Sequence, residues 1–545
     1  MVFKKPVSQE VRMRLYPLTL LALPLILSAA EAQTPASRII SARERPPVHV
    51  RIDQQMATGL RAGFKGDLSL NPYWLIDRDG VPHILEQDGV ARIIATLAPA
   101  AMRSSGHSPT IRIGGIGSEL TFWTSTGEPN PDWSQGRLTP RSMAALATLV
   151  RRTGYRVILT VNLGQYRRGN QSPERAADMV HHAKLALGES LAAVAIGNEP
   201  SLEPFTYDRN HDRSYQPDEI DLYWQDWNLF RSAIVERVPG MRFYGPSDFA
   251  IDDHNNIKPT IYEGFVERQA ALRDATGVAS VDTLTYHHYT ATACENAEQA
   301  TIPILLSSVQ RERTRRVARR LHTDAARLGV PAAFDERNSA SCAGKAGVSN
   351  TMASALWALD AILLNVQEGI VGQNFHAMLG RCGDEKPRYG WYTPFCAATD
   401  ADAVAGKLIA QPIFYGMLAA RLVPDGRYLA VTHSGPETLR IFAVREGQDA
   451  GARLSIVVIN VADPAPRPAE DIVIDLGSTY MAASSVTLQV AGKDGLRATS
   501  QVRLGGGEVD AKGQLNGMKW LPLSLSGNSL SLSVAGATAQ VIRIE

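Results

Sequence analysis

The sequence has few of the features that define several other protein classes. Its 545 residues include only four cysteines, and its 56 lysine and arginine residues nearly equal its 55 aspartate and glutamate residues, for a formal net charge of +1. A near-neutral chain has no global field to attract nucleic acid or anionic lipid. So few cysteines exclude a disulfide-dominated scaffold. The chain has no glycine period and no deficit of hydrophobic residues, which excludes collagen-like and disordered chains.

An apolar run near the N-terminus is too short to span a membrane. It extends from Leu15 to Leu27, whereas a membrane-spanning helix needs roughly 20 residues. Basic residues precede the run, and Ala30 and Ala32 form a small-x-small cleavage pattern after it. We therefore expect a signal peptide over residues 1–32, cleaved near Ala32, and a mature chain that is secreted or periplasmic, with no membrane anchor and close to neutral.

The four cysteines all lie in one third of the chain. In an exported protein an even number of cysteines favours disulfides, here two bridges among three possible pairings. We favour Cys294 with Cys342 and Cys382 with Cys396. Buried free thiols are the alternative. The sequence has no CxxC motif and no close Cys/His pair, so it does not favour zinc.

From about residue 63 to residue 376 short apolar runs alternate with longer amphipathic stretches, a pattern typical of βα units around a parallel sheet. The amphipathic stretches are long enough for crossover helices. Eight such units fit a (β/α)8 barrel, which we assign to residues 61–411. The expected strands are Gly63–Leu68, Thr110–Gly114, Val157–Asn162, Ala192–Gly197, Arg242–Gly245, Thr283–His287, Pro331–Asp335 and Ile370–Phe375.

The sequence changes character after about Pro412. Short β-branched segments separated by Gly, Asp, Asn and Pro follow one another, as in an antiparallel β-sandwich. We therefore assign residues 412–545 to a second, all-β domain. Residues 33–60 are expected to form a polar leader and a strand, Val48–Asp53, that joins the sandwich from the N-terminal side.

Two carboxylates stand at the ends of expected barrel strands. Glu199 ends the fourth strand within Gly197–Pro200, and Glu336 ends the seventh. In such barrels the catalytic groups lie where strands end and βα loops begin. Glycoside hydrolysis needs a carboxyl pair, one group to protonate the departing oxygen and one to attack the anomeric carbon or to activate water. Neither motif is specific alone, so the argument depends on their positions.

The chain also resembles a known family, glycoside hydrolase family 79, which contains β-glucuronidases and heparanases within a clan of retaining barrel enzymes. The resemblance covers most of the mature chain and depends on the order of several short motifs. These are Arg112-Ile113-Gly114-Gly115, Val161-Asn162-Leu163-Gly164, Gly197-Asn198-Glu199-Pro200, Tyr286-His287-His288-Tyr289, Glu336-Arg337-Asn338-Ser339 leading to Gly344-Lys345-Ala346-Gly347-Val348-Ser349, Asn374-Phe375-His376 and Tyr392-Thr393-Pro394.

The resemblance implies a retaining double displacement, with Glu199 as the general acid/base and Glu336 as the nucleophile. Asn198 is suited to bind the sugar 2-hydroxyl, and Tyr289 to hold the nucleophile by a hydrogen bond. His287 and His288 are consecutive, so on a strand only one of them faces the pocket.

The expected sugar subsite has further members. By resemblance, the uronic carboxylate would be held by backbone N–H groups around Ala343 and Gly344 and by Tyr392, and His376 is a further candidate for a sugar contact. Arg112 is expected to be a buried cation bonded to neighbouring carboxylates or carbonyls.

Two residues depart from the family pattern. Family members commonly carry a sugar-binding glutamate near the position of Leu70, and a residue smaller than Arg337 usually follows the nucleophile. The first change points to a substituted sugar, such as 4-O-methylglucuronic acid. Arg337 is expected either to contact an anion or to form a salt bridge with Asp335.

The leading interpretation is a retaining exo-β-glucuronidase acting on a carbohydrate that contains uronic acid, with no metal or organic cofactor and no nucleic-acid partner. Two alternatives stay open. One is an endo-acting, heparanase-like hydrolase, which the long loops Ser201–Pro217 and Arg381–Asp402 disfavour because they could close off a pocket. The other is a barrel that binds carbohydrate without cleaving it. The sequence leaves linkage, aglycone, transglycosylation and oligomeric state open.

Overall fold

The computed structural model describes residues 46–78, 80–98, 108–202, 207, 216–249, 260–294, 297–378, 380–382, 390–447, 452–463 and 469–545. The expected signal peptide and nearly all of the expected leader lie outside these residues, as do parts of the two long loops. Within the described ranges, the search for a helix long and apolar enough to cross a membrane finds none.

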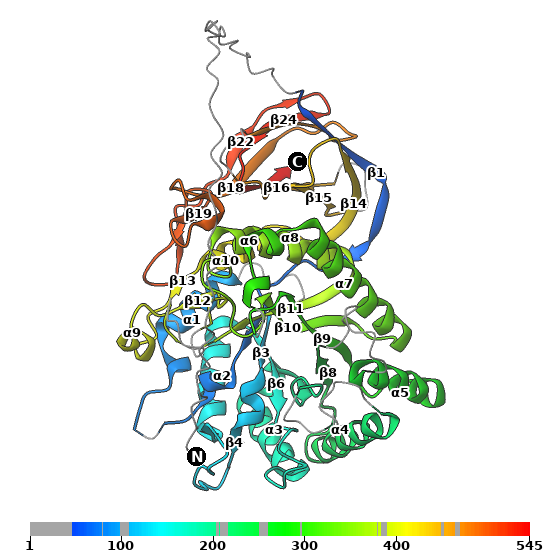
Figure 1. The fold of residues 1–545 in the computed structure, drawn as a ribbon, viewed down its shortest axis with the longest axis vertical. Coiled ribbons are helices and arrows are strands. Elements are labelled where there is room, and N and C mark those ends of the chain that lie inside the picture. The colour runs from blue at the N-terminus through cyan, green and yellow to red at the C-terminus, as the bar shows by residue number, and fades with distance from the viewer. Residues whose placement is uncertain are drawn as a thin grey trace, which may run out of the picture. The chain divides into compact units, whose positions relative to one another are not determined.

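Eight parallel strands close into a barrel, which confirms the expected (β/α)8 fold (Figure 1). Each strand pairs with its neighbour in the chain, and the last strand pairs with the first, with Phe375 opposite Leu68. The strands are β2 (Leu68–Leu70), β3 (Thr110–Ile113), β6 (Arg156–Val161), β7 (Leu191–Ile196), β8 (Phe243–Asp248), β9 (Thr283–Ala291), β10 (Ala332–Ala340) and β11 (Ile370–Ala377).

Helices surround these strands (Figure 1). Several begin at a capping side chain: Thr139 before α2 and Thr260 before α5 each form a capping box, which satisfies N–H groups of the first turn. Glycine in the left-handed conformation ends α2 and α7. The helices are α1 (Asp88–Leu97), α2 (Pro140–Thr153), α3 (Pro173–Leu187), α4 (Pro217–Arg237), α5 (Ile261–Thr276), α6 (Ile302–Leu305), α7 (Ser308–Leu328), α8 (Met352–Gln367), α9 (Asp400–Val404) and α10 (Pro412–Arg421).

Seven barrel strands begin within one residue of their expected positions, but the first does not. The expected strand 63–68 is replaced by β2, which begins at Leu68. Gly66 has φ 90°, outside the strand region, and a Cβ there would lie 2.9 Å from the carbonyl oxygen of Leu97. The chain therefore turns at Gly66 before it enters the barrel.

The remaining strands form an extended, mostly antiparallel sheet, as expected for the second all-β region. β1 (Val48–Arg61) lies in the middle of it, antiparallel to β14 and parallel to β17. The other strands of this sheet are β14 (Gly426–His433), β15 (Leu439–Arg445), β16 (Leu454–Asn460), β17 (Glu470–Asp475), β18 (Ala483–Val490), β19 (Val502–Leu504), β22 (Leu521–Leu523), β23 (Leu525–Ser526), β24 (Ser529–Val534) and β25 (Thr538–Ile544).

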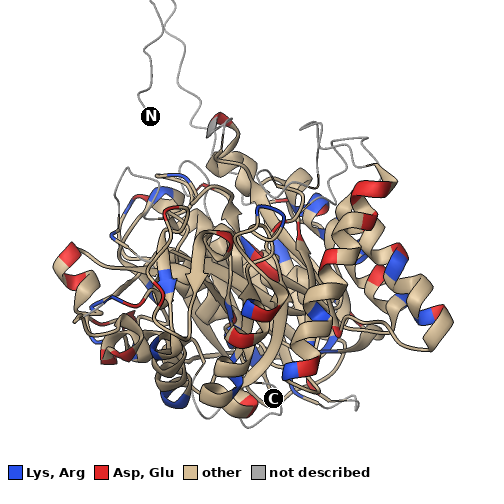
Figure 2. Cartoon of the chain, turned by 90° about the horizontal axis from the view of Figure 1, so that it is seen from below, with Lys and Arg blue, Asp and Glu red and all other residues tan. Residues whose placement is uncertain are grey.

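Among the described residues, three pairs of two-residue or three-residue strands lie outside the barrel and the extended sheet. The pairs are β4 (Thr121–Trp123) with β5 (Gly136–Leu138), β12 (Phe395–Cys396) with β13 (Ile409–Ala410), and β20 (Glu508–Val509) with β21 (Leu515–Asn516). Lysine and arginine residues alternate with aspartate and glutamate along the outer helices in Figure 2. Both signs of charge occur among the drawn elements in this view, in keeping with the near-neutral composition.

A buried ion pair links the barrel to the sheet. Asp360 of α8 accepts hydrogen bonds from Arg440 of β15 at 2.6 Å and from Arg311 of α7 at 3.0 Å. Arg440 and Asp360 are almost fully buried, and Arg440 also donates to the carbonyl of Leu306. Such a pair is costly to break because each partner leaves a buried charge behind.

We predict that Asp360→Asn lowers the free energy of unfolding by about 3 kcal/mol, because Arg440 then stays buried without a counter-charge. Urea denaturation at neutral pH measures this effect. The control is Asp463→Asn, which breaks the exposed pair with Arg497 and should change stability little. Equal shifts in the two variants would contradict the prediction.

Candidate active site

The two expected carboxylates meet at the carboxyl end of the barrel strands. Glu336 lies within β10, and Glu199 follows β7. One carboxylate oxygen from each, together with a ring nitrogen of His287 from β9, lie within 4.8 Å of one another. Retaining glycosidases hold their two carboxyl groups about 5–5.5 Å apart, whereas inverting ones leave room for a water at about 6.5–9.5 Å. This geometry suits direct attack by one carboxylate.

A β-bulge turns two consecutive residues of β10 toward the same site. Ala333 pairs with Thr285 of β9, but the next pair is Glu336 with His287, so β10 carries one extra residue between the two pairs. A bulge of this kind re-aims side chains that would otherwise alternate between faces. Consequently Asp335 and Glu336 both contact groups of the site, and both are buried.

Glu336 is held in its ionised form. Arg112 of β3 donates from Nη1 to its Oε2 at 2.7 Å, and the hydroxyl of Tyr289 donates to its Oε1 at 2.7 Å. Burial alone would raise the pKa of Glu336, but His376, His287 and Arg112, together with the Tyr289 hydroxyl, lower it to about 2. A carboxylate that stays charged at working pH is what a nucleophile requires.

Glu199 occupies a contrasting position. Its backbone is left-handed, with φ 51°, and its N–H donates to the carbonyl of Ser247 at 2.9 Å. Left-handed backbone is costly for a residue other than glycine and is found most often where function demands it. His287 Nδ1 lies 2.8 Å from Glu199 Oε1, so the second carboxyl oxygen stays available for a substrate.

His287 connects the two halves of the site. Its Nε2 lies 3.5 Å from Asp335 Oδ1 while its Nδ1 contacts Glu199. Burial lowers the pKa of His287, but the charges of Glu336 and Asp335 outweigh it and raise the pKa to about 10. With this raised pKa the ring carries a positive charge, so Nδ1 donates a hydrogen bond to Glu199 while Nε2 faces Asp335 at the longer distance of an ion pair. His288 points the other way, to Thr314 of α7, as strand alternation requires.

Arg112 also orients Asn198, the residue before Glu199. It donates from Nη2 to Asn198 Oδ1 at 2.8 Å, and the N–H of Gly115 donates to the same oxygen at 2.9 Å. The amide of Asn198 is therefore oriented with its Nδ2 group free of hydrogen-bond partners in the part of the chain that the structure describes. A buried donor without a partner is suited to a substrate hydroxyl.

Tyr392, Ala343 and Gly344 lie together on the side of Tyr289 and His376. The ring of Tyr392 packs 6.0 Å from that of Tyr289 and 5.9 Å from that of His376, centroid to centroid. Its backbone N–H donates to the carbonyl of Ala343 at 3.4 Å. His376 in turn lies 3.5 Å from Glu336 Oε2. The structure thus places Asn198, Tyr289 and His376 beside Glu199 or Glu336, with Tyr392 against Tyr289 and His376 and with Ala343 and Gly344 next to Tyr392.

The expectation for Arg337 was wrong. Its side chain contacts neither an anion site nor Asp335, but lies fully buried behind the barrel wall, where it donates to Gln373 and packs 5.2–5.7 Å from the rings of Phe334, Trp357 and Phe375. The reason is strand alternation, because the residue after Glu336 must face outward. Burial lowers the pKa of Arg337 to about 9.

Leu70 lies fully buried in the hydrophobic core. Its neighbour Ser69 is the residue of β2 that contacts the site, because its hydroxyl lies 3.1 Å from His376 Nδ1. The departure from the family pattern at Leu70 therefore leaves β2 without a carboxylate in this part of the site.

Glu119 is a positioning residue that sequence reasoning missed. Its carboxylate is almost fully buried and accepts hydrogen bonds from the N–H groups of Leu163 at 2.9 Å, Gly164 at 2.7 Å and Asn198 at 2.8 Å. It thereby joins the loop after β6 to the turn that carries Glu199. Burial raises the pKa of Glu119 to about 7. The only signal in the sequence is a lone carboxylate in the loop after the second strand.

The cluster of Glu199, His287 and Glu336 has ligand atoms close enough for a metal ion, but their bonding does not suit one. Glu336 already accepts from Arg112 and Tyr289. A cationic His287 offers N–H donors rather than lone pairs, and the guanidinium of Arg112 would repel a divalent cation. The three residues therefore fit proton transfer better than metal binding.

Comparison with known proteins shows similarity in fold. No protein-family model matches the sequence, and no curated protein matches it. A 4-O-α-L-rhamnosyl-β-D-glucuronidase from Fusarium oxysporum 12S, solved with Rha-GlcA, has a TM-score of 0.63 and 16% identity over 91% of this chain and 99% of its own.

Two further solved structures are similar at low identity. The GH51 arabinofuranosidase from Xanthomonas axonopodis pv. citri has a TM-score of 0.56 and 12% identity over 92% of this chain and 100% of its own. A monomeric β-xylosidase from Caulobacter crescentus CB15 has a TM-score of 0.53 and 16% identity over 91% and 99%. All three are glycoside hydrolases by name, and their likeness to this chain is one of fold.

We predict that Glu119→Gln reduces kcat by about 10–100-fold, because an amide satisfies fewer of the three N–H donors and the Asn198–Glu199 turn loses its anchor. The matched control is Asp67→Asn, since Asp67 is a buried carboxylate that also accepts backbone N–H groups, from Thr110 and Gln373, at the other end of β2. Both variants should lose thermal stability, but only Glu119→Gln should lose activity per folded molecule. Equal loss of activity in both would count against this role.

We also predict that Glu336→Gln lowers the pKa of His287 toward its ordinary range, because Glu336 supplies the largest of the charges that raise it. The raised pKa stabilises the fold below the ordinary histidine value of about 6.5, and this contribution is lost as the pH rises through about 10. Titration of the ring nitrogens by NMR measures the shift. An unchanged pKa would show that Asp335 alone sets it.

Proposed function

We propose that this protein is a retaining exo-β-glycosidase of the family 79 type, which releases glucuronic or 4-O-methylglucuronic acid from glycans or glycosides. The observation that carries the proposal is the short distance between Glu199 and Glu336 combined with their opposite surroundings. Glu336 is buried, ionised and held by two donors, whereas Glu199 contacts His287 through one oxygen and has no hydrogen bond to its other oxygen among the described residues. Two carboxyl groups in different environments are the requirement for double displacement.

In the first step a Glu336 oxygen attacks the anomeric carbon while Glu199 donates its proton to the departing oxygen. The bond from the anomeric carbon to the aglycone breaks, and a covalent glycosyl-enzyme forms. In the second step Glu199 removes a proton from water, the water oxygen attacks the same carbon, and Glu336 leaves as a carboxylate. Two inversions restore the β configuration.

The neighbours of Glu336 prepare it for the first step. Tyr289 and Arg112 fix one oxygen each, and burial and the charge of Glu336 raise the pKa of Tyr289 well above its ordinary value, so its hydroxyl remains a donor. The free Nδ2 of Asn198 is suited to the sugar 2-hydroxyl, a contact that can strengthen in the transition state.

His287 can respond to the covalent step. When Glu336 becomes an ester it loses its charge, so the pKa of His287 falls and its proton is held less tightly. Because His287 lies 2.8 Å from Glu199, the fall in the pKa of His287 alters the charge beside the acid/base group between the two steps.

The choice of a uronic acid is supported by the resemblance to family 79 and by the rhamnosyl-glucuronidase of similar fold. Within the chain it is supported by the loop around Ala343 and Gly344, whose backbone lies against Tyr392. Backbone N–H groups in a tight turn can bind an anion without a cation. The buried Leu70 leaves no carboxylate on β2 for a sugar hydroxyl, which favours a 4-O-substituted sugar.

An endo-acting, heparanase-like hydrolase of acidic polysaccharides is the second candidate, since it would use the same carboxyl pair. Product size on a uronic-acid polysaccharide separates the two: free monosaccharide indicates exo cleavage, and oligosaccharides indicate endo cleavage. Export after cleavage near Ala32 belongs to the same proposal and is checked by N-terminal sequencing of the protein released from its producing cells.

The expected result is hydrolysis of 4-nitrophenyl β-D-glucuronide and its 4-O-methyl form, with little action on the matching β-glucoside and β-galactoside. Glu336→Gln should reduce kcat at least about 10³-fold, because no nucleophile remains. Glu199→Gln should reduce it by about 10²–10⁴-fold on substrates with poor leaving groups and by less on nitrophenyl substrates, which need less protonation.

Glu368→Gln serves as the control, because Glu368 pairs with arginines on the outer helix α7. NMR of the first-formed sugar should show the β anomer. An α anomer, or full activity in Glu336→Gln, would exclude the proposed mechanism, whereas activity on another sugar alone would exclude only the proposed substrate.

A further inference from the structure

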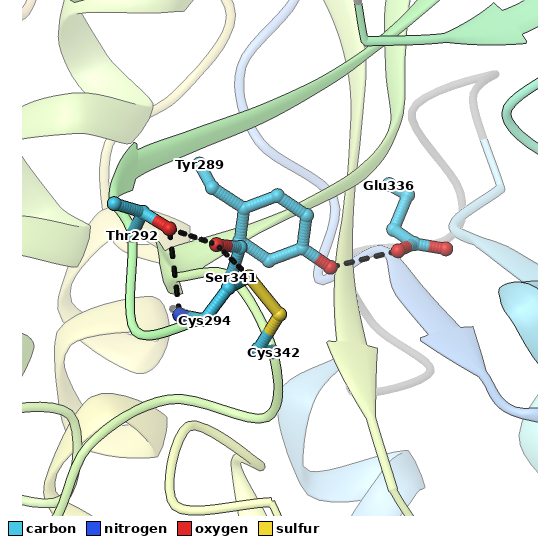
Figure 3. Close-up of a disulfide and its surroundings, with 6 residues drawn as sticks. All are labelled: Tyr289, Thr292, Cys294, Glu336, Ser341 and Cys342. Carbon is cyan, nitrogen blue, oxygen red and sulfur yellow. Dashed lines mark hydrogen bonds between the residues drawn. A yellow bond between two sulfur atoms is a disulfide. The ribbon is translucent and has the colours of Figure 1, made fainter. Parts of the chain in front are cut away.

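One of the two disulfides joins the ends of the strands that carry the catalytic machinery. Cys294 lies just after β9, which bears His287 and Tyr289, and Cys342 lies just after β10, which bears Glu336. The two cysteines are bonded, with their Cα atoms 5.2 Å apart. Figure 3 shows the bridge beside Tyr289, whose hydroxyl points to Glu336.

Polar bonds continue the contact between the two chain segments beyond the strands. Ser341 donates from its N–H to the carbonyl of Ala291 at 3.1 Å and from its hydroxyl to Thr292 Oγ1 at 3.1 Å. The N–H of Cys294 donates to the same Thr292 oxygen at 3.4 Å (Figure 3). The start of the loop after β10 is therefore held by both a covalent bond and hydrogen bonds.

The residues that follow have an unusual backbone. Cys342, Ala343 and Gly344 are consecutive and all left-handed, with φ 51°, 68° and 81°. L-residues with a Cβ atom disfavour this conformation, so two of the three need an external restraint. Within the residues that the structure describes, the N–H groups of Cys342 and Ala343 donate to no backbone carbonyl, whereas that of Gly344 closes a turn onto Ser341.

This loop lies directly against Tyr392. The carbonyl of Ala343 accepts from the N–H of Tyr392, and a Cβ on Gly344 would lie 2.9 Å from that same nitrogen and 2.8 Å from Ser349 Oγ. Asn338 of β10 also donates to the carbonyl of Tyr392 at 3.1 Å. A shift of the loop would therefore displace Tyr392, whose ring packs on Tyr289.

We propose that the Cys294–Cys342 disulfide is a specificity-determining restraint: it holds Cys342 and Ala343 in the left-handed conformation that presents their N–H groups, beside Tyr392, to the carboxylate of the uronic acid. This inference rests on the proposed function: the disulfide is the covalent bond that holds the loop proposed to bind the uronic carboxylate. The bridge acts on substrate affinity, because Glu336 keeps its own bonds to Arg112 and Tyr289 when the loop relaxes.

The test compares the double variants C294S/C342S and C294S/C342G with the unmodified enzyme on 4-nitrophenyl β-D-glucuronide. In C294S/C342S we expect KM, and the inhibition constant of glucuronic acid, to rise at least about tenfold while kcat changes less than about threefold. In C294S/C342G we expect most of the affinity to return, because glycine adopts φ 51° without a Cβ penalty. If the bridge only stabilised the fold, C294S/C342G would not recover affinity, because glycine also increases the conformational entropy of the unfolded chain and so lowers stability.

Val458→Ala in the buried core of the sheet is the stability control, because it lowers the melting temperature without touching the loop and should leave KM unchanged. An unchanged KM in C294S/C342S, or no recovery in C294S/C342G, would overturn the inference while the proposed function stands. An unmodified enzyme that is inactive on every β-glucuronide would instead overturn the proposed substrate and this inference with it.

Discussion

The site depends on the hydrogen bonds and ion pairs made by the buried guanidinium of Arg112. From β3 it reaches Glu336 and Asp335 of β10 and Asn198 after β7, so one buried cation connects groups from two other strands of the barrel. A buried cation without partners is unstable, and so is each of the carboxylates around it. The cluster is therefore stable only when it is complete, and completing it fixes the positions of the Glu336 carboxylate and of the Asn198 amide next to Glu199.

The two carboxyl groups of the site, Glu199 and Glu336, differ in their surroundings because of the backbone that carries them. The bulge in β10 places Asp335 below Glu336 on the same side of the strand, and Asp335 holds His287 and Arg112 in turn. Glu199 has a left-handed backbone conformation, and its own N–H donates to the carbonyl of Ser247. Small departures from regular strand geometry thus give two similar side chains different surroundings: Glu336 is buried between Arg112 and Tyr289, and Glu199 contacts His287 through one oxygen.

The rest of the site is built by contacts between loops. Glu119 joins the loops after β6 and β7 by accepting three backbone N–H groups, and the Cys294–Cys342 bridge joins those after β9 and β10. Loops without such links vary in position. Here a buried carboxylate on one side and a disulfide on the other restrain the loops at the rim of the barrel.

The amino-acid sequence alone was enough to predict the barrel, the later sheet region and the chain order of the strands, because alternation of apolar runs and amphipathic stretches is a local property. It also singled out Glu199 and Glu336 by their places at strand ends. The sequence did not predict the orientation of Arg337 or the contacts of Glu119. Arg337 faces outward because of strand alternation after a bulge that only pairing with β9 reveals, and Glu119 matters only through N–H groups more than forty residues away. Local pattern thus determined which elements form, and tertiary structure decided which side chains meet, because hydrogen bonds and charges act across distances in space that the order of residues does not contain.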